Sequence, residues 1–198
     1  GSAQVIPCEI YSAVFEAMNT AQRSKIVAGV NPRFNEIWWA FPSTGATEND
    51  TIVAYNHLEN TWALHSLERT ALTHRNVYTN PIMASATTGY LYDHETGYTW
   101  DGTQPYATSG PAELGAGDRI MRINNLGFDE GTSGDVTVTV FASNWPGLSE
   151  TTYGPYSSPN LVDCRIAGRM LRQKVIFQTG TGRWGTLRAD MMPGSWRF

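Results

Sequence analysis

The sequence predicts a mainly β protein whose strands form antiparallel meander sheets, arranged as β-propeller-like blades or as a sandwich, with one N-terminal helix. Three observations favour this class. Aromatic residues make up 12% of the chain, and 19 glycines supply turns between pleated segments. Charged residues reach only 16%. From residue 36 onward, apolar residues alternate with polar ones or form short runs, which is typical of strands.

The helix is predicted over residues 8–24, within a segment 1–34 that we interpret as a helix and connector. Its apolar residues recur at spacings of four, four and three, which places them on one stripe: Ile10, Val14, Met18 and Ala21. Pro7 stands where a first helical turn tolerates proline. Gly29 and the Asn31-Pro32 pair are expected to end the helix.

Residues 35–114 predict two repeated β-meander units. The strands of the first are 36–41, 51–55 and 61–67, and those of the second are 82–86, 90–93 and 98–100. Tyr92 and Trp100 follow Tyr55 and Trp62 by 37 and 38 positions. This offset is close to the roughly 40–50 residues of one propeller blade, so the two units predict an internal repeat.

Residues 90–102, YLYDHETGYTWDG, place an aspartate, a histidine and a glutamate side by side at 93–95. A transition metal needs three or four ligands, and the histidines of this chain show no metal-ligand spacing. The matching place in the first unit reads Asn56-His57-Leu58-Glu59, with the acids changed. We therefore interpret the segment as a structural turn rather than a catalytic cluster. The turn motif consists of Asp93, Gly97 and Trp100.

Signatures of an enzyme are weak elsewhere. The chain has no GxSxG nucleophile elbow, and the TGTG stretch at 179–182 lacks the lysine and helix of a phosphate-binding loop. A glycosidase needs a specific carboxylate pair, or a tyrosine nucleophile with arginines, and 18 acidic residues make some pair inevitable. We expect no enzyme activity, no metal and no cofactor.

A C-terminal β-sheet unit is predicted over 115–198, after a linker candidate at 101–118 that is rich in Gly, Pro, Ser and Thr. Its strands are expected at 119–123, 135–142, 161–178 and 184–191. Residues 160–198 hold seven basic and two acidic side chains, which indicates either an anion-facing surface or a solvated sheet face.

The candidate DNA-facing residues of this segment are Arg165, Arg169, Arg172 and Lys174. In one extended segment, Arg165 and Arg169 share one side, and Arg172 and Lys174 share the opposite side. No base-reading motif accompanies these cations. Any contact with DNA would therefore be nonspecific, salt-sensitive and made to phosphates.

Trp38 and Trp39 are adjacent on one predicted strand, so their side chains face opposite sides of the sheet. Two buried layers are therefore needed. A neighbouring blade, a domain or another subunit would supply the second layer, which makes both tryptophans candidate subunit-packing residues.

The chain resembles a known family in segments spread over most of its length. They include VFEAMNTAQRSKIVAGVNPRFNEIWWAFPS (14–43), ENDTIVAYNHLENTWALHSLERTA (48–71), GYLYDHETG (89–97), GAGDRIMRI (115–123) and RWGTLRADMMPGSWR (183–197). The most specific parts are Asn-Glu-Ile-Trp-Trp and Tyr-Asp-His-Glu-Thr-Gly. These segments resemble the tail structural proteins of short-tailed bacteriophages and their prophages, of the tail hub, nozzle or packaged-DNA-stabilisation class.

The resemblance implies a noncatalytic virion protein whose propeller-like β domains surround the tail tube, which closes behind packaged DNA and opens for ejection. It implies that the chain is made in the host bacterial cytoplasm, resides in the virion tail, and packs against its own copies and other tail proteins. Proteins of this family are usually much longer, so we expect a C-terminal fragment. No apolar run approaches the roughly 18 residues of a bilayer span, and we expect no membrane partner.

Two other functions stay open at this point. Abundant tryptophan, and the similarity of residues 90–102 to the Asp-box hairpin of sialidase-type propellers, favour a carbohydrate-binding or glycan-cleaving propeller-like module of a phage tail. Oxygen ligands in a glycine-bearing loop, at Asp93, Glu95 and Asp101, favour a calcium-stabilised scaffold.

Overall fold

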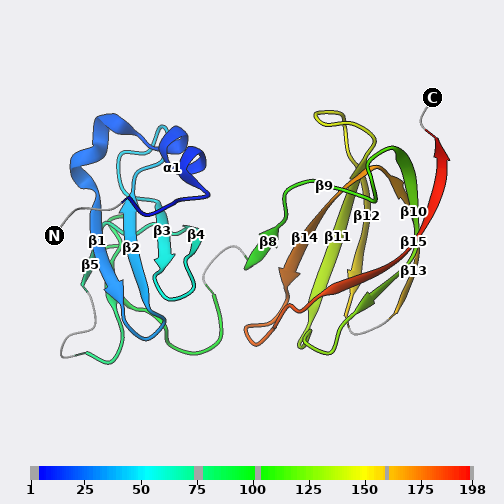
Figure 1. The fold of residues 1–198 in the computed structure, drawn as a ribbon. Coiled ribbons are helices and arrows are strands. Elements are labelled where there is room, and N and C mark those ends of the chain that lie inside the picture. Colours follow the sequence, from blue (N-terminus) through cyan, green and yellow to red (C-terminus); the bar gives the residue numbers. More distant parts are fainter. Residues whose placement is uncertain (1–4, 74–77, 101–103, 159–160, 197–198) are drawn as a thin grey trace. The chain divides into compact units, whose positions relative to one another are not determined.

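The computed structural model describes residues 5–73, 78–100, 104–158 and 161–196. The chain divides into two compact units, Gly1–Gly97 (unit 1) and Tyr98–Phe198 (unit 2), each of which is described by itself (Figure 1). Both units consist mainly of antiparallel strands, and unit 1 carries one N-terminal α-helix. The predicted fold class is confirmed.

A four-stranded antiparallel sheet forms the centre of unit 1, in the order β1-β2-β3-β4. Its strands are β1 (Val27–Asn31), β2 (Glu36–Phe41), β3 (Thr51–Asn56) and β4 (Thr61–Ser66). The turn between β3 and β4 forms because Asn56 Oδ1 accepts hydrogen bonds at 3.0 Å from the backbone N–H groups of Leu58 and Glu59. Asn60 completes this turn with a positive φ of 54°. The predicted first hairpin is therefore present.

Both faces of this central sheet are covered. On one face lies a three-stranded sheet in the order β5-β6-β7, with β5 (Ala71–Thr73), β6 (Ile82–Ala84) and β7 (Leu91–Asp93). The buried cluster on this side contains Trp38, Ala40, Ile52, Ala54 and Met83. On the other face, the buried cluster contains Val14, Phe41 and Val53, and Ile10, Met18, Ile26, Trp39 and Trp62 pack against it. The N-terminal segment therefore supplies the second layer.

The N-terminal helix is shorter than predicted. The α-helix α1 spans Tyr11–Ala17, and a 3-10 helix, η1, spans Thr20–Lys25. Between them Met18 is extended, with a ψ of 133°, and forms a β-bridge with Ser43. Asn19 explains the break, because its Oδ1 accepts a hydrogen bond at 3.2 Å from the N–H of Ala21 and starts η1. The single helix predicted over 8–24 is therefore wrong at its centre.

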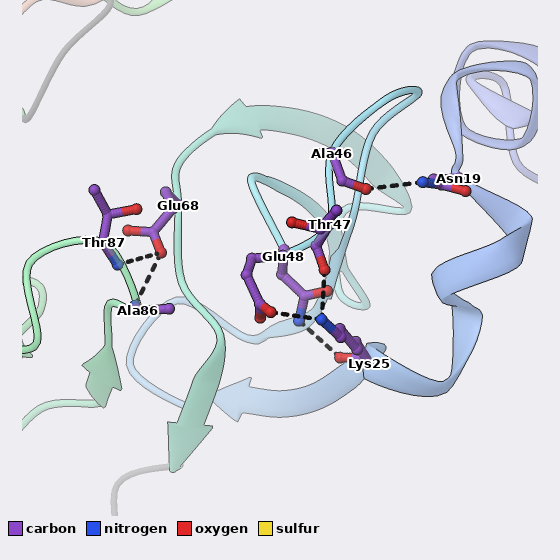
Figure 2. Close-up of polar contacts among 9 residues, drawn as sticks. Asn19, Lys25, Ala46, Thr47, Glu48, Glu68, Ala86 and Thr87 are labelled. Atoms are coloured by element: carbon purple, nitrogen blue, oxygen red, sulfur yellow. Dashed lines mark hydrogen bonds and ion pairs between the residues drawn. The ribbon is translucent and has the colours of Figure 1, made fainter.

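Figure 2 shows how the 3-10 helix region holds the loop between β2 and β3. Asn19 Nδ2 donates a hydrogen bond to the carbonyl of Ala46 at 2.8 Å. Lys25 Nζ donates to Glu48 Oε1 at 2.5 Å, and both side chains are more than one-third exposed. Exposed pairs of this kind contribute about 0–1 kcal/mol each, so they fix the loop more than they stabilise the unit.

Figure 2 also shows Glu68 closing the turn between β6 and β7. Its Oε1 accepts hydrogen bonds from the N–H groups of Ala86 at 3.0 Å and Thr87 at 3.3 Å, and its Oε2 accepts one from the hydroxyl of Ser85. These hydrogen bonds hold the pKa of the Glu68 carboxyl below its usual value, although desolvation acts in the opposite direction as the largest single cause. Glu68 is therefore a structural residue of the small sheet.

Unit 2 is a β-sandwich (Figure 1). Sheet A has the order β13-β10-β15, and sheet B has the order β12-β11-β14-β8, with β9 also paired to β14. The strands are β8 (Tyr106–Thr108), β9 (Ala112–Glu113), β10 (Arg119–Phe128), β11 (Val136–Ser143), β12 (Thr151–Ser157), β13 (Val162–Gly168), β14 (Met170–Phe177) and β15 (Leu187–Trp196).

The sandwich core follows from the strict alternation of β11. Val136, Val138 and Val140 are fully buried, and the residues between them are half-buried on the other side of the strand. Sheet A contributes Ile123, Leu126, Cys164 and Ile166 to the same core. A sandwich is one of the two sheet architectures that the sequence predicted.

Three predicted segments differ from the structure. Residues 98–100 form no strand and belong to unit 2, so the described part of this stretch, 90–100, holds the strand β7 but no hairpin, and the predicted third strand of the second unit is absent there. The linker candidate 101–118 contains β8 and β9, which both pair with β14. The segment 161–178 holds β13 and β14, which lie in different sheets. Among the described residues, no helix is long and apolar enough to cross a membrane.

Candidate functional site

The structure separates the four candidate DNA-facing residues. Arg165 is exposed on β13, in sheet A. Arg172 and Lys174 lie on β14, in sheet B, and Arg169 lies in the connection between these two strands. Because the chain changes sheets at this connection, the expectation that Arg165 and Arg169 share one side of a strand is wrong. Three of the four cations therefore lie on β14 of sheet B or directly before it: Arg169, Arg172 and Lys174.

The cations of β14 lie over aromatic rings. The Cζ atom of Arg172 is 4.2 Å from the ring centroid of Phe141, its cross-strand partner on β11. The Nζ atom of Lys174 is 4.4 Å from the ring centroid of Tyr106 on β8. Phe141 faces outward because its neighbours in the strand, Val140 and Ala142, face the core. Cation–π contacts of this kind contribute about 0.5–1 kcal/mol at exposed sites.

The third cation extends this arrangement to the end of the sheet. The Cζ atom of Arg169 is 5.3 Å from the ring centroid of Trp145, in the loop between β11 and β12. Trp145 is 50% exposed and Tyr106 is 57% exposed, so a partner can reach both rings. We call this set of residues the cation–aromatic face: Tyr106, Phe141, Trp145, Arg169, Arg172 and Lys174.

Acidic side chains hold both arginines of this face in place. Arg172 forms a two-point contact with Glu150, with Nε 3.0 Å from Oε1 and a second bond from Nη2 to Oε2. Its hydrogen bond lowers the pKa of Glu150 and raises that of Arg172. Arg169 Nη2 lies 2.6 Å from Glu113 Oε1 on β9. Two of the three positive charges are therefore matched locally, which weakens the attraction of this face for phosphates.

The predicted subunit-packing tryptophans lie inside unit 1. Trp38 is 7% exposed in the cluster against the small sheet, and its Nε1 donates to Glu36 Oε2 at 2.9 Å. Trp39 lies on the opposite face, with its ring centroid 6.1 Å from that of Trp62. Their opposite orientation was predicted correctly. The second layer that the pair required belongs to the same chain.

The predicted turn motif is only partly assembled. Gly97 has a positive φ of 82°, as expected for a glycine that shapes a turn. The backbone carbonyl of Asp93 accepts a hydrogen bond from Thr96 Oγ1 at 3.3 Å. Trp100 lies in unit 2 and is half-buried. The ring of Tyr92 lies under the guanidinium of buried Arg69, whose Cζ is 4.1 Å from the centroid.

A second polar cluster of unit 1 surrounds Glu95. Asn31 is fully buried, and its Nδ2 donates to Glu95 Oε1 at 3.3 Å, while its Oδ1 has no hydrogen-bond partner among the described residues. Burial raises the pKa of the Glu95 carboxyl, and the negative charge of Glu36 raises it further, against the opposing effect of Arg33. The folded unit therefore binds a proton on Glu95 more tightly than the unfolded chain does.

Glu95→Gln is expected to stabilise unit 1 by about 1 kcal/mol at pH 7, because the new amide can donate to the unsatisfied oxygen of Asn31. The raised carboxyl pKa means that the wild type gains stability as pH falls through this pKa. The difference between variant and wild type should therefore shrink toward pH ~4, where Glu95 is itself protonated. Urea unfolding of the variant and the wild type at pH 7 and at pH ~4 measures this difference in unfolding free energy. Glu59→Gln in the exposed β3–β4 turn serves as the control, and an equal response of both variants would contradict this assignment.

Sequence reasoning did not find the aromatic members of the cation–aromatic face. The alternation of DVTVTV (135–140) predicts an outward orientation for Phe141, because the next residue falls on the side of the threonines. Its pairing with Arg172 was not readable, because strand register across the sheet leaves no local signal at either residue.

Within the described ranges, no group of three or more His, Cys, Asp or Glu residues could hold a metal ion. Asp101, which belongs to the predicted calcium loop, lies outside the described residues. No protein-family model matches the chain, and no curated protein matches it at a significant level.

Proposed function

We propose that this chain is a noncatalytic structural component of a bacteriophage tail, where it assembles with its own copies and with other tail proteins around the DNA passage. The resemblance of its segments to short-tailed phage tail proteins motivates the proposal. The chain would be made in the host bacterial cytoplasm and would reside in the virion tail.

The observation that carries the assembly role is the composition of the cation–aromatic face. Tyr, Trp, Phe and Arg are the residues enriched in protein–protein interfaces and in their energetic hot spots. Trp145 and Tyr106 are each at least half exposed in the isolated chain. Glu113 and Glu150 already hold the two arginines, so a partner would pay less side-chain entropy to order them.

Contact with packaged DNA stays a separate prediction for Arg165, Arg169, Arg172 and Lys174. The described geometry favours a protein partner for sheet B, because carboxylates already face two of its three cations. A DNA duplex binds mainly through release of counterions by unpaired cations.

Purified particles of the phage that encodes the chain are the system for the test. We expect to detect the chain in these particles by mass spectrometry. A Tyr106→Ala/Trp145→Ala double variant should lower its incorporation at least tenfold, because each hot-spot ring contributes about 2 kcal/mol or more. Tyr90→Ala, which removes an aromatic ring that is 69% exposed in unit 1, is the matched control. Absence of the chain from particles would refute the tail proposal, and normal incorporation of the double variant would refute the role of this face.

A further inference from the structure

Two adjoining hollows lie along sheet A, and the first also reaches Tyr156 on β12 of sheet B. The first has a volume of about 600 Å³ and is lined by Asn124, Asn125, Tyr156, Asp163, Cys164 and Arg165. The second, of about 510 Å³, is lined in part by Asn125, Gly127, Leu161, Arg188 and Asp190. Asn125 lines both, so the hollows meet there. We call the two together the polar groove. Both hollows are broadly open to solvent, and their volumes fall in the roughly 300–1,000 Å³ range of small-molecule sites.

Strand register builds the centre of the polar groove. Asn125 on β10 pairs with Asp163 of β13 on one side and with Asp190 of β15 on the other. Cross-strand partners share a face of the sheet, so a carboxylate, an amide and a second carboxylate form one row. Both pairings shift register between Ile123 and Asn125. This irregularity adds the amide of Asn124 to the first hollow.

Hydrogen bonds fix the central amide. The amide of Asn125 is assigned the orientation in which its Nδ2 faces two acceptors, because it then donates to Asp163 Oδ1 at 2.5 Å and to the carbonyl of Asn124 at 3.1 Å. This leaves the amide oxygen of Asn125 as an acceptor. Arg188 Nη2 lies 3.3 Å from Glu130 Oε2, but the two side chains are 65% and 86% exposed. A pair this exposed holds Arg188 weakly, so its guanidinium can donate to a ligand.

The charges of the polar groove balance. Asp163 and Asp190 match Arg165 and Arg188, and two asparagine amides add donors and acceptors without charge. A polyanion such as DNA would meet the two carboxylates as well as the two guanidiniums. A neutral ligand with many hydroxyl groups suits this set better, because each hydroxyl both donates and accepts.

The second hollow also offers apolar surface. Leu161 is 73% exposed beside it. Gly127 leaves the backbone of β10 bare there, and a Cβ added at this position would meet only Leu161 Cδ1, at 3.6 Å. Sugars combine hydroxyl groups with apolar C–H faces, which matches polar side chains next to an apolar wall.

We propose that the polar groove binds a neutral oligosaccharide, with one sugar in each hollow and the amide of Asn125 between them. This activity is independent of the tail-assembly role and of the cation–aromatic face. The planar amide, carboxylate and guanidinium groups would select the hydroxyl pattern of the glycan.

A glycan array of neutral and acidic glycans, probed with the full chain, tests the proposal, followed by titration calorimetry with the best neutral hit. We expect Asn125→Ala to weaken binding at least tenfold. Gly127→Val should do the same by filling the second hollow. A Cβ at this position meets only the exposed side chain of Leu161, in ordinary contact, and valine suits a strand, so we expect the variant to fold; circular dichroism checks this. Tyr106→Ala, on sheet B, should bind as the wild type does.

The following outcomes would each reject the polar groove as a glycan site. Silence across the array would do so, as would binding that survives both Asn125→Ala and Gly127→Val. Loss of binding in Tyr106→Ala would move the site to the cation–aromatic face. Preference for acidic glycans or for a thymidine oligonucleotide, with strong salt dependence, would indicate a polyanion site instead. None of these results depends on whether the chain enters phage particles.

Discussion

Phe41→Ala is expected to lower the free energy of unfolding of unit 1 by about 3–5 kcal/mol, the usual range for removing a buried phenylalanine ring. Phe41 is 1% exposed on β2 and forms a cluster with Val14 of α1 and Val53 of β3. Loss of its ring leaves a cavity between the helix and the sheet, where a short helix has little other support. Native-state hydrogen exchange of the β2 and β3 amides measures the loss directly.

Phe34→Ala is the matched control for this prediction. Phe34 is 42% exposed in the turn before β2, and its ring lies 5.2 Å from the Cζ atom of Arg33. Its loss should cost less than ~1 kcal/mol. Equal protection of the β2 and β3 amides in both variants would show that the N-terminal helix does not form the second layer of this sheet.

Period-two patterns predicted most strands of the chain, and the reason is visible at β11. DVTVTV alternates because one side of the strand faces the sandwich core, and Val136, Val138 and Val140 are fully buried there. The opposite orientation of Trp38 and Trp39 followed from the same geometry. Patterns of this kind report which side of a strand is buried, and they predicted those sides correctly.

The same patterns do not report which strands are neighbours. Residues 161–178 were read as one segment, yet the chain changes from sheet A to sheet B at Arg169. The short strands β8 and β9 were read as linker because three and two residues carry too little periodicity to detect. The contact between Lys174 and Tyr106 depends on the pairing of β14 with β8. The sequence therefore predicted the cations of the cation–aromatic face but not the aromatic residues that contact them.

The apparent repeat failed for a local reason. In the first copy, Asn60 alone takes a positive φ, of 54°, and the chain returns as β4. In the second copy both Glu95 and Gly97 do so, with φ values of 63° and 82°. Glu95 Oε1 then accepts a hydrogen bond from Asn31, on the central sheet. Similar residue types at similar spacing thus serve a hairpin in one place and a contact between sheets in the other.

Gly154→Ala is expected to destabilise unit 2 by about 2–5 kcal/mol, from the combined cost of a left-handed backbone and of overpacking. Val138 pairs with Tyr156 and Val140 pairs with Tyr153, so β12 carries one more residue than β11 between these pairs. This bulge allows Tyr153 and Tyr156 both to pack on the sandwich core, although residues three apart on a regular strand face opposite sides.

Only glycine fits the bulge. Gly154 has a φ of 95°, and a Cβ there would lie 2.9 Å from the carbonyl oxygen of Val138 and 3.0 Å from the nitrogen of Tyr156. Both atoms belong to the backbone of paired strands, so they cannot move without breaking the ladder. Because Tyr156 lines the first hollow of the polar groove, this variant should also weaken any glycan binding there.

Gly147→Ala separates the cost of the left-handed backbone from the cost of overpacking. Gly147 has a similar φ, of 77°, but a Cβ there would meet no atom within 4 Å. This variant should therefore lose only the roughly 1–2 kcal/mol of backbone strain. Chemical denaturation of both variants, with hydrogen exchange of the β12 amides, measures the difference. If Gly154→Ala is no worse than Gly147→Ala, the bulge tolerates a side chain, and the inward placement of both tyrosines must have another cause.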